Sequence, residues 1–176
     1  REVAPTWDHS AQSITFSADG KTIYTTAEDV GQTKLFAIDV KTGKVAALTG
    51  EGHVGAFSAA DVSTVIAQDN LKTPAQLYAL APKGAPIQLT GLNADKLQGV
   101  AMGEAEQFSF KGWNDETVHG YLVKPANFDP AKKYPVAFLI HGGPQGSFGN
   151  LFHYRWNAQT YAGAGYAVVM IDFHGS

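Results

Sequence analysis

The sequence of 176 residues contains no cysteine, which excludes disulfide bonds and thiolate metal sites. This absence leaves the cellular compartment open, because an oxidising environment does not require disulfides. No apolar run approaches the roughly 18 residues of a membrane-spanning helix, so we predict no membrane span. Acidic residues outnumber basic ones by 16 to 13 and no lysine or arginine cluster occurs, so we predict no nucleic-acid partner.

The sequence also lacks an initiator methionine and a signal-like segment at Arg1. We therefore expect the chain to be cut from a longer polypeptide. Its composition is otherwise that of a globular protein, with 44% hydrophobic and 16% charged residues.

The first half of the sequence repeats itself. Phe16-Ser-Ala-Asp-Gly20 returns as Phe57-Ser-Ala-Ala-Asp61, and Leu48-Thr49 returns as Leu89-Thr90, at offsets of 41 residues. Lys34-Leu-Phe-Ala37 returns as Gln76-Leu-Tyr-Ala79 at an offset of 42 residues. This period lies within the range of a four-stranded β-propeller blade. Alternating segments predict strands at 13–16, 22–26, 34–39, 62–68 and 76–80, with turns at 18–20 and 41–43.

An apolar run in the second half breaks abruptly into His141-Gly-Gly-Pro144. Residues 136–140 are apolar without alternation, which predicts a strand buried on both faces of a largely parallel sheet. Gly142 and Gly143 have no side chains to cover the main chain at the carboxyl end of that strand, and Pro144 restricts the backbone that follows. Main-chain N–H groups in this position can donate hydrogen bonds to a substrate oxygen on which negative charge develops. The alternative is an ordinary strand-to-helix turn.

Further elements surround this glycine loop. Residues 106–110 and 117–123 predict a hairpin, and 125–133 predict its connection to the buried strand. Residues 151–164 predict a helix with Asn150 as N-cap and Gly163 or Gly165 as its end. Residues 166–171 predict a second buried strand, parallel to the first through a right-handed crossover.

Residues 108–176 resemble the start of the catalytic domain of the prolyl oligopeptidase (S9) family of serine peptidases, in its dipeptidyl-peptidase 5 and acylaminoacyl-peptidase branch. The motifs that carry this resemblance are Gly120-Tyr-Leu-Val-Lys-Pro125, Lys132-Lys-Tyr-Pro-Val136, His141-Gly-Gly-Pro144, Pro144-Gln-Gly-Ser-Phe148, Tyr154-Arg-Trp156, Ala162-Gly-Ala-Gly-Tyr-Ala-Val-Val169 and Asp172-Phe-His-Gly-Ser176. His174 departs from the pattern, because many members carry arginine there.

The resemblance implies β-propeller blades (all-β) followed by the N-terminal part of an α/β-hydrolase domain. We expect about two blades in residues 1–91, a linker in 92–107 and the truncated catalytic domain in 108–176. The whole protein would release dipeptides or acylated residues from peptide N-termini by acyl transfer. The propeller would restrict access to its active site.

The site residues that we predict are Gly143, as the oxyanion donor, Gly142, as the second choice, and His141, which braces the loop. No Gly-x-Ser-x-Gly elbow occurs, because Gln145 stands where its first glycine would be. The nucleophile, acid and base of the family order therefore fall after Ser176, and we expect the chain alone to be inactive.

Two alternatives stay open. One is a propeller-based binding module fused to a non-catalytic hydrolase remnant. The other is a metal-dependent hydrolase whose ligands are His141, Asp172 and His174, which lie at or just past two strand ends. In the main interpretation no metal or cofactor is needed and the partner is a peptide substrate. The resemblance favours a periplasmic or secreted location and allows a homodimer through the catalytic domain of the full-length protein.

Overall fold

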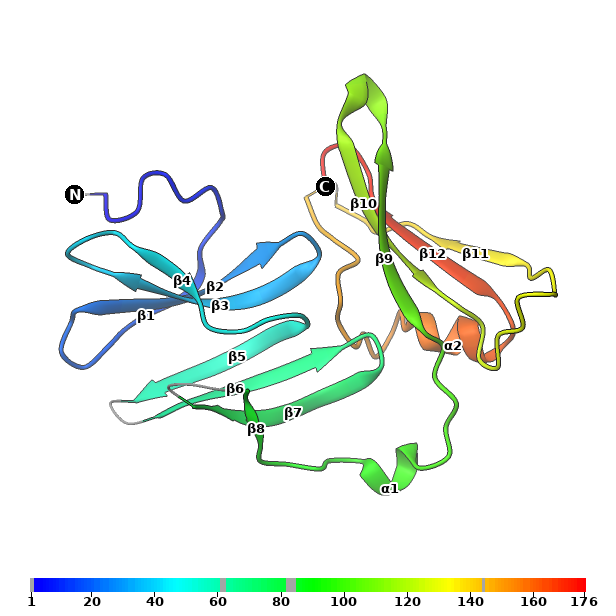
Figure 1. Cartoon of the computed structure of the whole chain (residues 1–176), viewed down its shortest axis with the longest axis horizontal. Helices are drawn as coiled ribbons and strands as arrows, with labels where there is room; N and C mark the ends of the chain where they lie inside the picture. The colour runs from blue at the N-terminus through cyan, green and yellow to red at the C-terminus, as the bar shows by residue number, and fades with distance from the viewer. Residues whose placement is uncertain (1, 61–62, 82–84, 144) are drawn as a thin grey trace. The chain divides into compact units, whose positions relative to one another are not determined.

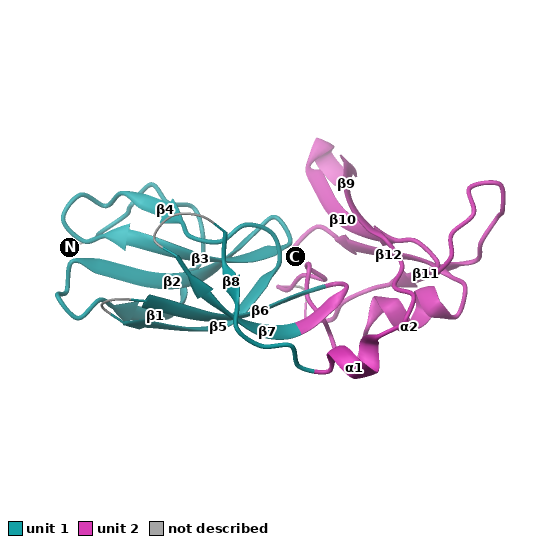
Figure 2. Cartoon of the chain, turned by 60° about the horizontal axis from the view of Figure 1, so that its bottom comes forward, with its two compact units in different colours: residues 1–70, 75–92 teal, residues 71–74, 93–176 magenta. Residues whose placement is uncertain are grey.

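The computed structural model describes residues 2–60, 63–81, 85–143 and 145–176 (Figure 1). The chain is mostly β-sheet with few short helices. It divides into two compact units, which Figure 2 colours separately. Unit 1 comprises residues 1–70 and 75–92, and unit 2 comprises residues 71–74 and 93–176. The predicted turns at 18–20 and 41–43 lie between strands as expected, whereas Asp61, Val62 and Pro144 fall outside the described residues.

Unit 1 is built from two groups of four strands, each in sequence order within one eight-stranded sheet. The first strand group consists of β1 (Gln12–Phe16), β2 (Thr22–Asp29), β3 (Gln32–Asp39) and β4 (Val45–Ala47). The second strand group consists of β5 (His53–Ala60), β6 (Ser63–Asn70), β7 (Thr73–Leu80) and β8 (Ile87–Gln88). A short parallel contact between Thr33 and His53 joins the groups. None of the predicted strands covers β4, β5 or β8.

The sequence repeat corresponds to a repeated set of hydrogen bonds. In the first strand group, the Leu35 N–H donates to Thr49 Oγ1 over 3.0 Å, and the Leu48 N–H donates to the Leu35 carbonyl over 2.7 Å. In the second strand group, the Leu77 N–H donates to Thr90 Oγ1 over 2.9 Å, and the Leu89 N–H donates to the Leu77 carbonyl over 2.8 Å. The repeated Leu-Thr pairs therefore satisfy the same main-chain donor in each group.

The core of unit 1 contains side chains from both strand groups. Leu35 from β3 and Val54 and Ile66 from β5 and β6 are almost fully buried, with Tyr24, Phe57, Tyr78 and Leu80 packed around them. The two groups share this cluster, so each buries part of its apolar surface against the other.

Unit 2 contains a four-stranded sheet in the order β11 (Val136–Leu139), β12 (Ala167–Asp172), β10 (Thr117–Val123) and β9 (Ala105–Lys111). The expected hairpin is confirmed, with the short 3-10 turn η1 (Trp113–Asp115) between β9 and β10. The expected parallel pairing of β11 and β12 is also confirmed. The sheet as a whole is not largely parallel, however, because the β12–β10 and β10–β9 pairs are antiparallel.

One face of this sheet packs against helix α2 (Ala158–Gly163). Val123, Val168 and Met170 from the sheet and Ala158 and Ala162 from the helix are nearly inaccessible to solvent. Ala137 and Leu139 of β11 pack against the same cluster. The helix therefore fixes β11 and β12, the two strands that lead into the segments described below.

The predicted helix at 151–164 is much shorter than expected. Asn157, not Asn150, is the N-cap, and its side chain accepts from the Gln159 N–H over 2.9 Å. The Asn150 side chain instead accepts from the Leu71 N–H over 3.0 Å. His153 Nδ1 accepts from two main-chain donors, Arg155 and Trp156, and this local pattern competes with a helical turn. The expected end is confirmed, because α2 ends at Gly163. Another short helix, α1 (Ala94–Leu97), follows unit 1 in the sequence.

The prediction that residues 136–140 are buried on both faces is wrong. Val136, Phe138 and Ile140 are 61%, 51% and 65% exposed, whereas Ala137 and Leu139 are half-buried. β11 is at the edge of the described sheet, and successive side chains of a strand point to opposite faces. Only the face that packs on α2 is covered.

Candidate functional site

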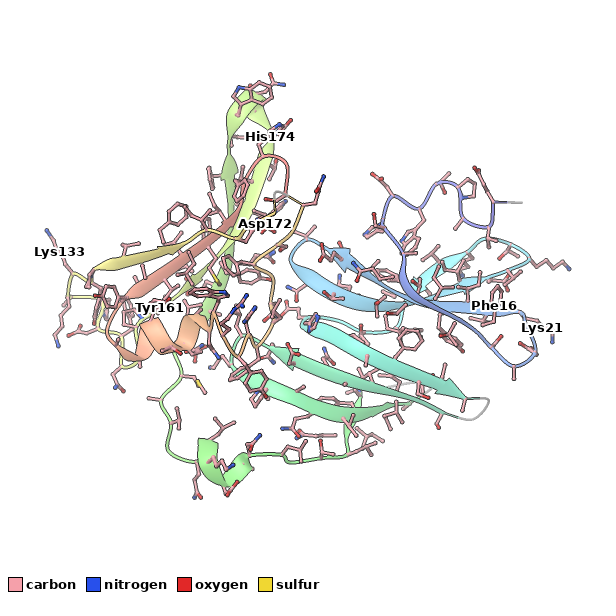
Figure 3. The ribbon with its side chains drawn as sticks, turned by 180° about the vertical axis from the view of Figure 1, so that it is seen from behind. Phe16, Lys21, Lys133, Tyr161, Asp172 and His174 are labelled. Atoms are coloured by element: carbon pink, nitrogen blue, oxygen red, sulfur yellow. The ribbon has the colours of Figure 1, made fainter. Side chains whose placement is uncertain are left out.

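The glycine loop follows β11, and a second polar segment, residues 172–176, follows its parallel neighbour β12. The carboxyl ends of parallel neighbours lie at the same edge of a sheet, so the loop and this segment are brought together. Figure 3 labels Asp172 and His174 in the second segment. We call residues 141–148 the glycine loop and residues 172–176 the brace segment.

Gly142 and Gly143 are both exposed. Within the described part of the chain, neither of their N–H groups donates a hydrogen bond to another residue. Gly143 has φ of +85°, a conformation that other residues rarely adopt, and a Cβ built on Gly142 would meet no atom within 4 Å. Two main-chain donors are therefore accessible to an external acceptor.

His141 is anchored at both ring nitrogens, with its side chain only 7% exposed. Nδ1 lies 3.1 Å from the Gly142 carbonyl oxygen, and Nε2 lies 2.9 Å from Ser176 Oγ. A carbonyl can only accept, so Nδ1 carries the proton. In the neutral ring Nε2 then accepts from the Ser176 hydroxyl. The ring also stacks on Phe173, with centroids 4.5 Å apart, and meets the edge of Phe148 at 5.8 Å.

The bond from His141 to the Gly142 carbonyl orients the next main-chain donor. The Gly142 carbonyl and the Gly143 N–H belong to one peptide unit, and the described chain contains no cis peptide bond. In a trans peptide the C=O and N–H groups point in opposite directions. Because His141 holds the carbonyl on one side, the Gly143 N–H is directed to the other side.

Asp172 holds the far end of the glycine loop. Its carboxylate accepts from Ser147 Oγ over 2.7 Å and from the Phe148 N–H over 3.2 Å. Its Oδ1 also lies 3.9 Å from His141 Nε2. The brace segment thus contacts both ends of the loop.

A cavity of about 570 Å³ adjoins the loop within unit 2. Ile140, His141, Gly142, Phe148, Arg155 and Trp156 are among its lining residues. The Arg155 guanidinium lies over the Trp156 ring, 5.5 Å from its centroid. A molecule in this space would reach the main chain at Gly142.

The hydroxyl of Ser176 does not complete a catalytic triad with His141 and Asp172. In a triad the aspartate faces one ring nitrogen of the histidine and the serine faces the other. Here Ser176 and Asp172 both face Nε2, and Nδ1 is bonded to the Gly142 carbonyl. This arrangement fits the expected bracing role of His141 better than the role of a general base.

The proposed metal ligands do not converge. His174 pairs instead with Glu116, whose Oε2 is 2.6 Å from His174 Nδ1. Among the described residues, no group of three or more histidine, aspartate or glutamate side chains could hold a metal ion. The geometry thus gives no support to the metal-dependent alternative.

Ser147, Phe148 and Ser176 were not among the site residues predicted from the sequence. The signal that could have identified them is the predicted parallel pair of strands, because residues just past the ends of such strands become neighbours. Within the described ranges, no helix is long and apolar enough to cross a membrane.

Unit 2 combines a mixed sheet, the helix α2 and a glycine loop with accessible N–H groups. This combination is that of an α/β protein in which a ligand can reach the carboxyl end of a strand. No protein-family model matches the chain. "Probable dipeptidyl-peptidase 5" from Aspergillus clavatus is 39% identical over 182 residues, which cover 99% of this chain and 25% of that protein.

Solved structures of acylaminoacyl peptidases share the fold of the chain. The enzyme from Pyrococcus horikoshii has a TM-score of 0.80 and 25% identity over 96% of this chain and 26% of its own. An acylaminoacyl peptidase in complex with Z-Gly-Gly-Phe-chloromethyl ketone has a TM-score of 0.81 and 26% identity, over 95% of this chain and 25% of its own.

These relatives confirm that the chain resembles the prolyl oligopeptidase family of serine peptidases, in the dipeptidyl-peptidase 5 and acylaminoacyl-peptidase branch. The chain spans about a quarter of the length of the relatives that it matches.

Proposed function

We propose that this chain is part of a serine exopeptidase that releases dipeptides or acylated residues from peptide N-termini. The relatives named dipeptidyl-peptidase and acylaminoacyl peptidase support this reaction class. Acyl transfer proceeds through a tetrahedral intermediate whose oxygen carries negative charge. The chain would supply part of the group that stabilises this charge.

The Gly143 N–H is the donor that we assign to this oxyanion, with the Gly142 N–H as second choice. The observation that carries the proposal is the pair of accessible amides at the carboxyl end of β11, one of them oriented through His141 and the Gly142 carbonyl. Donors that are fixed before the reaction need no reorganisation when charge develops, and removing one such donor costs about 100- to 1,000-fold in kcat. The second oxyanion donor and the catalytic triad would come from other parts of the full-length protein.

Unit 1 fits two blades of a β-propeller. Its two strand groups, their repeated Leu-Thr hydrogen bonds and the core between them support this interpretation. Unit 2 fits the opening strands of an α/β-hydrolase sheet. In the full-length protein the propeller would limit which peptides reach the glycine loop, and a peptide N-terminus is the partner that this reaction requires. We keep as predictions the domain limits at 91/92 and 107/108 and the periplasmic or secreted location.

The test compares the full-length protein with residues 1–176 on chromogenic dipeptidyl and acetyl-aminoacyl substrates. We expect the full-length protein to hydrolyse at least one of them and to be inhibited by a serine-directed phosphonate. We expect no turnover by residues 1–176, because they lack the nucleophile elbow. Hydrolysis by the short chain that the phosphonate blocks would contradict the proposed division of roles. A full-length protein that cleaves neither substrate would favour the binding module instead.

A further inference from the structure

We propose that Ser176 and Asp172 are positioning residues for the oxyanion amide, and that together they hold the glycine loop in its donating conformation. This inference rests on the proposed function of the Gly143 N–H. It adds two residues of the brace segment that do not contact the substrate oxygen but determine where the amide points. Ser176 acts at the start of the loop and Asp172 acts at its end.

Ser176 acts through the ring of His141. Its hydroxyl donates to Nε2, which leaves the ring proton on Nδ1, and Nδ1–H in turn donates to the Gly142 carbonyl. Without this hydroxyl, the neutral ring can also carry its proton on Nε2 and donate toward the Asp172 carboxylate, 3.9 Å away. The Gly142 carbonyl would then lose its donor, and the Gly142–Gly143 peptide would be free to rotate.

Asp172 acts on the other end of the loop. Its two oxygens accept from the Ser147 hydroxyl and the Phe148 N–H, so one carboxylate fixes a side chain and the adjacent main chain. Asp172 is the last residue of β12, and β12 is anchored in the sheet by its pairing with both β11 and β10. The loop is therefore tied at both ends to the brace segment, which continues from the strand beside the one from which the loop emerges.

The first experiment measures kcat, KM and inhibitor affinity in the full-length protein. Ser176→Ala and Asp172→Ala should each lower kcat about 10-fold or more, since misplacing a preorganised donor forfeits part of its effect. KM should change less than about threefold, because ground-state binding does not depend on this amide. Affinity for a peptide boronate, which mimics the tetrahedral intermediate, should fall in parallel with kcat. Affinity for the dipeptide product should not.

Conservative variants separate this role from general stabilisation of unit 2. Ser176→Thr keeps the hydroxyl, and Asp172→Asn keeps an acceptor for Phe148 and gains an amide donor for the Ser147 oxygen. Both should recover most of the lost kcat. Glu116→Gln is the matched control, because it weakens the contact of the brace segment through His174 without touching the glycine loop. It should leave kcat unchanged.

A double-mutant cycle tests the route from Ser176 through His141. If Ser176 acts through this ring, Ser176→Ala should have almost no further effect in a His141→Ala background. Additive losses in the double variant would overturn this route. A kcat within twofold of the unmodified protein in both Ser176→Ala and Asp172→Ala would overturn the whole inference.

Hydrogen exchange distinguishes failure of this inference from failure of the proposed function. The Phe148 amide, whose N–H donates to the Asp172 carboxylate, should exchange faster in Asp172→Ala and not in Glu116→Gln. This readout needs no activity, so it also applies if the full-length protein hydrolyses no substrate. Unchanged exchange of the Phe148 amide in Asp172→Ala would contradict the bracing by Asp172 even in an active enzyme.

Discussion

Unit 1 and unit 2 each hold a histidine close to an aspartate, but the two pairs have different surroundings. In unit 1, His53 Nδ1 lies 3.1 Å from Asp69 Oδ2. These residues are directly opposite each other on β5 and β6, inside a strand ladder. In unit 2, His141 lies beyond the end of β11, and its Nδ1 is bonded to the main chain of an exposed glycine.

This difference shows that a short distance between histidine and aspartate does not identify a functional site. The His53–Asp69 pair joins two strands that are already paired by the ladder, so it adds to the stability of unit 1. The His141 ring instead contacts Ser176 of the brace segment with Nε2 and the Gly142 carbonyl with Nδ1, and so links this segment to a peptide unit with an accessible N–H. The two roles differ in what Nδ1 contacts, which is a carboxylate on the neighbouring strand for His53 and a main-chain carbonyl of an exposed glycine for His141.

The largest effect that we expect is from Gly143→Pro in the full-length protein. Proline has no N–H, and its φ near −65° is incompatible with the +85° of Gly143. We expect kcat to fall about 100- to 1,000-fold, which corresponds to about 3–4 kcal/mol of transition-state stabilisation. KM should rise much less, because substrate binding before the reaction does not use this donor. Steady-state kinetics with the preferred chromogenic substrate measures both constants.

Thermal unfolding of the same variant provides the control. Gly143 is exposed and belongs to neither of the buried clusters, so the unfolding temperature should stay within a few degrees of the unmodified protein. Equal losses in kcat and in substrate affinity would count against the oxyanion role of Gly143. A large fall in unfolding temperature would show that Gly143 stabilises the fold.

The sequence predicted correctly those elements whose structure depends on residues close together in the chain. The apolar run at 136–140 covers β11, which ends at Leu139, and the hairpin at 106–123 and the turns at 18–20 and 41–43 are where their residues indicated. These features depend on alternation and turn chemistry within a few residues. The glycine loop was located for the same reason.

Features that depend on distant neighbours were not predictable in this way. The whole of β5 was missed because its sequence, His-Val-Gly-Ala-Phe-Ser-Ala-Ala, is rich in alanine and glycine, and pairing with β6 makes it a strand. Asn150 looked like a helix cap, but its side chain accepts from the Leu71 N–H, 79 positions away in the sequence. The contact of Ser176 with His141 spans 35 positions and exists because β11 and β12 are parallel neighbours.

A smaller effect of a different kind should follow from breaking the His53–Asp69 pair. Asp69→Ala leaves His53 without this partner, and we expect a loss of about 0.5–1.5 kcal/mol in the free energy of unfolding of unit 1, because the His53 side chain is partly exposed and water can replace the aspartate. The kcat of the full-length protein should not change. Urea denaturation and steady-state kinetics on one preparation test both statements. A fall in kcat without a change in the denaturation midpoint would contradict our distinction between the two histidines.

The smallest effect concerns the acid response of unit 1. The Lys34 ammonium donates to Asp29 over 2.6 Å, and this bond, opposed by partial burial, lowers the pKa of the Asp29 carboxyl below its ordinary value. The unfolded chain then binds the proton at a higher pH than the folded chain does. The stability that the pair contributes is therefore complete above the ordinary aspartate pKa and is lost as the pH falls through the lower, folded value.

Asp29→Asn removes this titrating group and should reduce the difference between the urea midpoints measured at pH 5 and pH 3. The reduction should correspond to less than about 1 kcal/mol, because the pair is partly exposed and screened by solvent. Lys34→Met should reduce the difference similarly, since it removes the main cause of the lowered pKa. If both variants keep the full acid dependence, the ion pair does not contribute to it, and other carboxylates of unit 1, such as Asp39, must account for the loss of stability in acid.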